Sequence, residues 1–282
     1  MSLFQRPVRG GGRPAASAWA VLLCLGVFVC AWGCAPARVA VPPAPLPSAG
    51  ELLSQIEVRR QAVSALRALV RVEYRDPEVR GAARQAVVAS RPNRFRVEIF
   101  SVAGVASLAV CDGDTLAVYF PEDRAVYRGP ATAANVAYYL RVGLSPTEAV
   151  DLLLGLPQGP IPATDGRLSF DQGRGLLRVE VAAAEGGRRV LWFDDRWRRL
   201  IRSEEVAPDG ALLSWAQFSG YENVDGLWFP LEVSLSDERE RRTVTLRYER
   251  VELNPVLPEG VFTLPSQVGV RELDVGDPRG TR

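Results

Sequence analysis

From residue 69 to residue 128, hydrophobic and polar residues alternate with a period of two in short segments. This alternation predicts half-buried β-strands, and turn signals such as Asp112-Gly113-Asp114 mark their ends. Because the segments recur about every ten residues, the pattern favours an antiparallel meander over β-α-β units. The expected strands are at 69–74, 83–90, 94–101, 104–111, 114–120 and 124–128.

Helical patterns stand before and after this run of strands. Residues 51–67 place Leu52, Ile56 and Val63 on one face of an amphipathic helix. A short helix is expected at 131–140, and a second one begins at Ser145-Pro146-Thr147-Glu148, which combines a capping serine, a proline at the first position and a capping-box glutamate. That helix is expected to run to Gly155.

A second run of strands follows the helical insert. Two hairpins are expected, which turn at 185–187 and at 208–210. Strands at 228–236 and 242–253 and a short strand at 261–264 complete the run. With about eleven or twelve strands in all, residues 49–270 are expected to form one domain, and residues 271–282 a disordered polar tail.

Each predicted strand has one apolar face, and one side of a large sheet must therefore be covered. The predicted fold class is mainly β (α+β), with a large antiparallel sheet that curls into an unclosed barrel and helices that cover its apolar cavity. The candidates for lining that cavity come from the apolar strand faces. They are Phe95, Val97, Ile99, Leu116, Val118, Phe120, Trp215, Phe229, Leu231, Val233 and Leu235.

The N-terminal segment has the pattern of a secretory signal. Arginines precede an apolar stretch at 15–31, which is slightly short for a membrane span. Ala31-Trp32-Gly33-Cys34 resembles the lipobox of bacterial lipoproteins, although that motif prefers Leu first and a small residue second. We expect a signal peptide at 1–33, lipid attachment at Cys34 and a Pro-rich tether at 34–48. An ordinary cleaved signal and a retained membrane anchor are the alternatives.

Composition excludes several kinds of chemistry. The 282 residues carry a net charge of +1, which argues against nucleic acid as a partner. The chain has neither His nor Lys, so Ser-His-Asp triads, Schiff-base lysines and histidine metal sites are excluded. Asp112 and Asp114 stand where a hairpin turn favours Asp, and Cys111 is expected to be a buried strand residue. No enzyme activity, metal or cofactor is expected.

Several segments taken in order resemble the LolA/LolB family of periplasmic lipoprotein carriers and receptors. These are 91–129, the helix end VDLLLGLP at 150–157, WAQFSGYENVDGLWFPLEVSL at 215–235 and LNPVLPEGVFTLP at 253–265. The resemblance covers residues 49–265. It implies an unclosed barrel around an apolar cavity that holds acyl chains. The cysteine of the lipobox is similar to that of the membrane-anchored receptor in this family.

The resemblance implies a monomeric lipoprotein, anchored in the outer membrane and facing the periplasm, that delivers lipoproteins to that membrane. Its partners would be acyl chains or lipoprotein cargo, and a soluble LolA-like carrier. Ala35 after the cysteine resembles the outer-membrane sorting signal, and Val102 corresponds to the receptor's membrane-inserting loop. The alternative is a lipid-anchored scaffold or lipid sensor of the same fold, with protein partners and no transfer activity.

Overall fold

The computed structural model describes residues 45–141, 143–161, 166–194, 196, 198–266 and 268–275. The chain divides into two compact units, Met1–Ala40 and Val41–Arg282, and every described residue belongs to the second. The predicted signal peptide, Cys34 and most of the predicted tether lie outside the described residues. All described core contacts are formed within the second unit, so a chain that starts at Val41 retains them.

The first run of strands matches the alternation in the sequence closely. It comprises β1 (Ala65–Arg75), β2 (Arg80–Ser90), β3 (Arg94–Ser101), β4 (Gly104–Cys111), β5 (Thr115–Phe120) and β6 (Ala125–Pro130). The second run comprises β7 (Arg167–Asp171), β8 (Leu176–Ala182), β9 (Arg188–Asp194), β10 (Leu200–Val206), β11 (Leu212–Val224), β12 (Leu227–Asp237), β13 (Arg242–Leu253) and β14 (Arg271–Asp274). A short 3₁₀ turn at Ala184–Gly186 lies in the predicted hairpin between β8 and β9.

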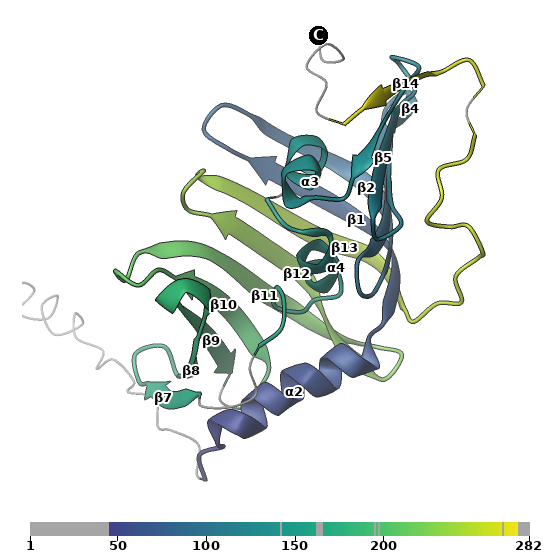
Figure 1. Ribbon diagram of the computed structural model, residues 1–282. Helices are drawn as coiled ribbons and strands as arrows, with labels where there is room; N and C mark the ends of the chain where they lie inside the picture. Colours follow the sequence, from purple (N-terminus) through teal and green to yellow (C-terminus); the bar gives the residue numbers. More distant parts are fainter. Residues whose placement is uncertain are drawn as a thin grey trace, which may run out of the picture. The chain divides into compact units, whose positions relative to one another are not determined.

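All fourteen described strands form one sheet that is not closed (Figure 1). Its order is β14-β6-β5-β4-β3-β2-β1-β13-β12-β11-β10-β9-β8-β7, and every neighbouring pair is antiparallel except β14 with β6. The pairing of β1 with β13 joins the two runs at the middle of the sheet. The predicted fold class, mainly β with an unclosed sheet and covering helices, is confirmed.

This order explains why the helical insert lies across the sheet. The insert leaves β6 near one end of the sheet and must reach β7 at the other end, twelve strands away. At about 4.8 Å per strand that path is roughly 58 Å along a flat sheet. The insert contains α3 (Ala133–Leu140) and α4 (Pro146–Leu153), and α4 packs on β2 and β3 while α3 packs on β5.

The first described helix, α2 (Ala49–Ala62), begins at a capping box in which the Ser48 hydroxyl accepts the Glu51 N–H and the Glu51 carboxylate accepts the Ser48 N–H. The sequence predicted this helix to reach residue 67. It ends at Ala62 because the chain turns extended at Val63, and Leu66 then pairs with strand residues on both sides. Sheet pairing here overrides the local helical pattern.

Most of the buried apolar side chains form one cluster between the sheet and the helices. A second, smaller cluster lies on the other face, where Phe262 packs with Leu108 and Val110. The sequence predicted a strand at 261–264, and this was wrong because those residues form turns that dock Phe262 on the sheet. None of the helices among the described residues is long and apolar enough to span a membrane.

The sequence also placed the end of the folded domain at residue 270, and predicted disorder beyond it. Instead Arg271–Asp274 form β14, which pairs parallel with β6. The Arg271 N–H donates to the Arg124 carbonyl at 2.9 Å, and Gly129 has no side chain to obstruct Val275. Backbone hydrogen bonds to an available sheet edge order this polar segment, which carries no hydrophobic signal of its own.

A buried ion pair connects α2 to the insert. Arg60 is 8% exposed and Asp151 on α4 is 1% exposed, with 2.6 Å between Arg60 Nη1 and Asp151 Oδ2. Arg60 Nη2 also donates to the carbonyls of Pro157 and Gly159, and the Gly159 N–H donates to Asp151 Oδ2. The guanidinium of Arg91 lies 4.0 Å from the other carboxylate oxygen. The pair thus holds α2, α4 and the segment after α4 together.

We expect Asp151→Ala to lower the free energy of unfolding by about 3–5 kcal/mol, because it leaves the buried Arg60 guanidinium without its carboxylate. Urea denaturation of the chain from Val41 measures this. The matched control is Glu252→Ala, which removes the partner of Arg67 from an exposed pair and should cost less than about 1 kcal/mol. Equal losses in the two variants would contradict the role given to the buried pair.

Candidate functional site

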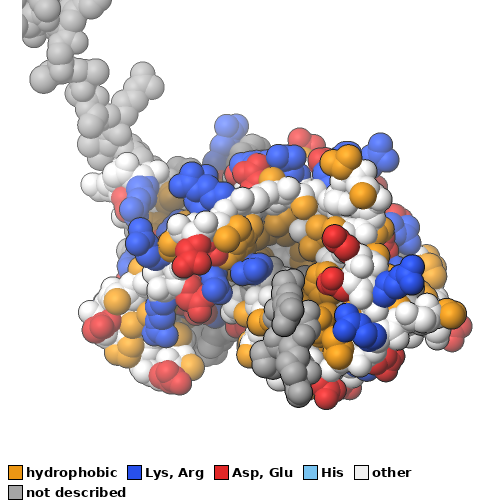
Figure 2. All heavy atoms as spheres, turned by 90° about the horizontal axis from the view of Figure 1, so that it is seen from above, with side chains coloured by type: hydrophobic (Ala, Val, Ile, Leu, Met, Phe, Trp, Pro, Cys, Tyr) orange, Lys and Arg blue, Asp and Glu red, His pale blue; other side chains and the backbone are white. Residues whose placement is uncertain are grey.

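The first cavity lies between the sheet and the helical insert and has a volume of about 370 Å³. That size falls within the range of about 300–1,000 Å³ that is typical of small-molecule sites. Figure 2 shows hydrophobic side chains gathered in a hollow between charged ones. Its lining residues are Val72, Tyr74, Gly81, Ala82, Ala83, Gln85, Phe95, Val97, Ile99, Val136, Tyr139, Arg141, Leu144, Ala149, Leu152, Leu153, Val244 and Leu246.

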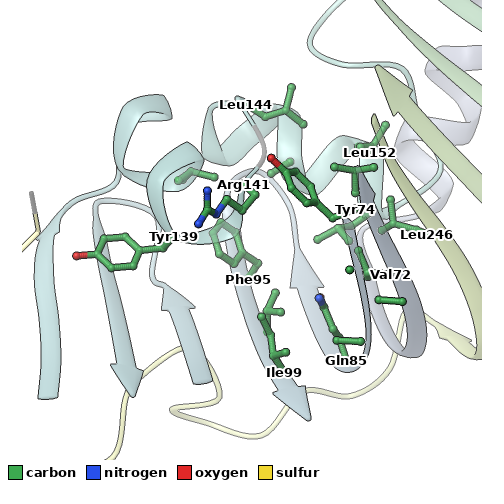
Figure 3. Close-up of a pocket in the computed structure, with 18 residues that line it drawn as sticks. Val72, Tyr74, Gln85, Phe95, Ile99, Tyr139, Arg141, Leu144, Leu152 and Leu246 are labelled. Atoms are coloured by element: carbon green, nitrogen blue, oxygen red, sulfur yellow. The ribbon is translucent and has the colours of Figure 1, made fainter. Parts of the chain in front are cut away.

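Strand alternation supplies the floor of the first cavity. Phe95, Val97 and Ile99 stand two residues apart on β3 and therefore face the same side of the sheet. Val72 of β1 pairs directly with Ala83 of β2 and extends this face. Figure 3 shows side chains from the strands and side chains from the insert around the same space.

The insert forms the opposite wall of the first cavity, through α3, α4 and the residues between them. The end of α4 is fixed to the sheet because the Tyr248 hydroxyl of β13 donates to the Leu153 carbonyl at 2.9 Å. Burial raises the pKa of Tyr248, so this hydroxyl stays protonated as a donor at neutral pH. Together with the Arg60–Asp151 pair, this contact holds the insert over the first cavity.

Few polar groups line the first cavity. The Tyr74 hydroxyl hydrogen-bonds the Asp76 carboxylate, and burial together with that carboxylate raises the pKa of Tyr74. Arg141 follows α3 in the left-handed conformation, and Gln85 and Tyr139 are the remaining side chains with polar atoms. None of the eighteen lining residues is Asp, Glu, Ser or Cys. The first cavity is therefore suited to hold an apolar group and presents few groups that orient one.

The residues that the sequence suggested as cavity lining fall into three groups: those that line the first cavity, those in the packed core, and Trp215, which lies on the outer face. Phe95, Val97 and Ile99 line the first cavity. The others on the same face belong to the packed core, either buried in it or partly buried against it. They are Leu116, Val118, Phe120, Phe229, Leu231, Val233 and Leu235.

Trp215 was predicted on the cavity side, and the structure corrects this. Ala216 and Phe218 face inward from β11 and are buried in the core. Trp215 directly precedes Ala216 on the same strand, so its side chain faces outward. The indole N–H donates to Glu238 at 2.8 Å, and the Arg202 guanidinium lies 4.3 Å from the ring centroid. Trp192 likewise lies beneath two arginines on the outer face.

Two further predicted positions concern the membrane. Val102 is fully exposed at the turn between β3 and β4, where Ser101 hydrogen-bonds the backbone of Ala103 and Gly104. The turn thus presents an apolar side chain to solvent. Cys34, the predicted lipid attachment site, lies outside the described residues.

Acidic residues at two of the turns have structural roles. Asp112 accepts the backbone N–H groups of Asp114 and Thr115, which is the turn role expected of it. Asp194 accepts the Arg199 N–H across the turn between β9 and β10. In the described part of the chain, no cluster of three or more Cys, Asp or Glu side chains could hold a metal ion.

Most of the other residues that line the first cavity were not predicted from the sequence. Val72 and Ala83 follow from the alternation of β1 and β2, but Ala83 is small and gave no signal of its own. Val136, Leu144 and Ala149 lie on the insert, whose position over β2 and β3 depends on strand order. A search for the apolar faces of the two short helices would have found Val136 and Ala149, whereas Leu144 lies between the helices and gave no such signal.

Comparison with known proteins gives a fold and no family. No family model matches the chain, and no curated protein matches it. A solved structure of a DUF1329 family protein from Desulfovibrio piger is similar over 76% of this chain and 95% of its own, at 13% identity and a TM-score of 0.54. A LolA superfamily protein from Nitrosomonas europaea is similar over 77% and 98%, at 16% identity and a TM-score of 0.52. At these identities the likeness shows a shared LolA-like fold.

The single cysteine of the described chain is a packing residue, as predicted. Cys111 is buried in the main core, and its thiol lies 3.4 Å from the Asn93 carbonyl. Burial raises the pKa of this thiol, which lowers its thiolate fraction at neutral pH.

The chain from Val41 contains Cys111 as its one thiol, and we expect that thiol not to react with an aromatic disulfide reagent at pH 8. Reaction requires both exposure and the thiolate, and the fold suppresses both. Absorbance of the released thiolate measures the reaction, and the same protein in denaturant, where one thiol per chain should react, is the control. Rapid labelling of the folded chain would contradict a buried, packing Cys111.

Proposed function

We propose that this chain is a lipoprotein of the outer membrane that holds the acyl chains of lipids or lipoproteins in the first cavity and helps to deliver them to that membrane. The observation that carries the proposal is the apolar lining of the first cavity on a LolA-like fold. An acyl chain that enters such a cavity leaves water, at roughly 0.8 kcal/mol for each methylene. The polar groups near Tyr74 and Arg141 accommodate the part of the ligand that is not hydrocarbon.

The anchor and the turn of Val102 complete the proposal. Lipid on Cys34 holds the protein at the membrane, and the residues up to Ser48 separate it from the folded unit. Exposed Val102 then contacts the bilayer during delivery, since an apolar side chain at a turn enters a membrane interface readily. A soluble carrier of similar fold is the proposed donor of the cargo.

We expect the chain from Val41, exported to a bacterial periplasm, to co-purify with acyl lipid. Ala83→Phe places a phenyl ring in the first cavity and should reduce the bound lipid about tenfold, a loss equal to 1.4 kcal/mol. Mass spectrometry of the extracted lipid gives the amount for each protein.

Ala86→Phe is the matched control, because Ala86 is on the other face of the same strand and pairs with Glu98. It should retain the lipid of the unmodified protein. No acyl species in any preparation, or equal amounts in both variants, would contradict acyl binding in the first cavity.

The anchor has a separate test in the full-length chain. Cys34→Ala should move the protein from the membrane fraction to the soluble periplasmic fraction, because it removes the atom to which lipid is attached. Cys30→Ala should leave it in the membrane fraction. Immunoblots of the separated fractions measure the distribution, and a membrane-bound Cys34→Ala variant would show that the lipobox assignment is wrong.

A further inference from the structure

A second cavity, separate from the first in its lining residues, lies beside α2. It has a volume of about 440 Å³ and is bounded by α2, the segment after α4, the turn between β9 and β10, and the hairpin between β11 and β12. Its described lining includes Arg59, Arg198 and Arg199 and contains neither Asp nor Glu. The nearby Asp194 carboxylate accepts the Arg199 N–H and keeps its negative charge, which offsets only part of the charge of the three guanidinium groups. The second cavity is therefore cationic.

Arg59 has hydrogen-bonding capacity that the described residues do not use. Its Nη1 donates to the Trp228 carbonyl, while Nε and Nη2 are buried and have no hydrogen-bond partner. Burial lowers the pKa of Arg59, which reflects the cost of keeping its charge away from water. Buried donors are nearly always satisfied by protein, water or ligand, so two unpartnered donors beside a cavity indicate a missing acceptor.

Arg199 forms the facing side of the second cavity. Its guanidinium lies 3.8 Å from the centroid of the Trp228 ring and 5.6 Å from that of Tyr221. The Tyr221 hydroxyl donates to the Leu200 carbonyl, and burial raises its pKa to about 12, so no phenolate balances the arginines. The Trp228 ring holds the Arg199 guanidinium in place by stacking, and because the ring carries no charge it does not neutralise the cation.

Apart from Ser54 and Gln55 of α2, the remaining wall of the second cavity is apolar. Ile56, Val63, Leu156, Phe193 and Leu227 line it, and they come from four different parts of the chain. A hydrated inorganic ion would leave this hydrocarbon surface in contact with water. A ligand with both a negative group and an aliphatic chain satisfies both parts of the lining.

We propose that the second cavity binds an amphiphilic anion, a carboxylate or phosphate oxyanion on an aliphatic chain, with Arg59 and Arg199 as its charged partners. The oxyanion meets Arg199 first. It then accepts hydrogen bonds from Nε and Nη2 of Arg59 as the guanidinium turns away from Gly155, beside which it has room because Gly155 lacks a side chain: an added Cβ would lie 3.2 Å from Nη2. This site is independent of acyl binding in the first cavity.

Calorimetry on the chain from Val41 separates the two sites. Dodecanoate, dodecanol and inorganic phosphate are the probes, each below its micelle concentration, and Ala83→Phe serves as the background that fills the first cavity. In that background we expect dodecanoate to bind at one site per chain and dodecanol, which lacks the charge, to bind about tenfold more weakly or less. Inorganic phosphate should bind more weakly than dodecanoate.

Substitutions then locate the site. Adding Arg199→Gln to Ala83→Phe should weaken dodecanoate binding about tenfold, and Arg59→Gln should do the same where thermal unfolding shows that it remains folded. Arg67→Gln is the control, because Arg67 pairs with exposed Glu252 outside both cavities, and it should change nothing.

Unchanged dodecanoate binding in the Arg199→Gln variant would overturn the proposal, whatever the stability of the Arg59 variant. If dodecanol bound equally well, the site would not require an anionic head group. If inorganic phosphate bound equally well, the site would not require an aliphatic chain. Either result would overturn the proposal. A failure of acyl binding in the first cavity would instead be seen as Ala83→Phe having no effect on co-purified lipid in a chain that also carries Arg199→Gln. The two hypotheses therefore fail in different measurements.

Discussion

The buried pair of Arg60 and Asp151 is the interaction on which the arrangement of the helices depends. α2 and α4 are far apart in the sequence, and both place apolar side chains in the same core. The Arg60 guanidinium donates hydrogen bonds to one carboxylate oxygen and two carbonyls, and these directional bonds fix the position of α2 relative to α4 and the segment after it. Because burying both charges is costly, the pair is best understood as a device that specifies geometry.

The open sheet explains why cavities exist at all. Fourteen strands present a long apolar face, and among the described residues three helices and one connecting segment are available to cover it. The connection from β6 to β7 has to cross that face from end to end, so it covers the face thinly. Between the insert and the strands β1, β2 and β3, small residues such as Ala83 leave space that side chains do not fill.

The strands could be predicted from the sequence because their signals are local. Alternation on β3 placed Phe95, Val97 and Ile99 on one face, and the turn at Asp112 marked the next reversal. Trp215 was misplaced because a large aromatic residue was assigned to the core by its hydrophobicity. Alternation along β11 instead directs its side chain outward, where it packs against Arg202. The strand β14 and the second cavity were missed because partners remote in sequence create both, and no local pattern encodes such partners.

An open sheet also has two ends, and their form bears on how the protein behaves at high concentration. The terminal strands β7 and β14 are five and four residues long, much shorter than the central β1 or β13. Both carry charged side chains, Arg167 and Asp171 on one and Arg271, Glu272 and Asp274 on the other. Short, charged edge strands offer a poor template for a strand from another molecule. A sheet that must stay open to hold its cavities is thereby protected against edge-to-edge aggregation.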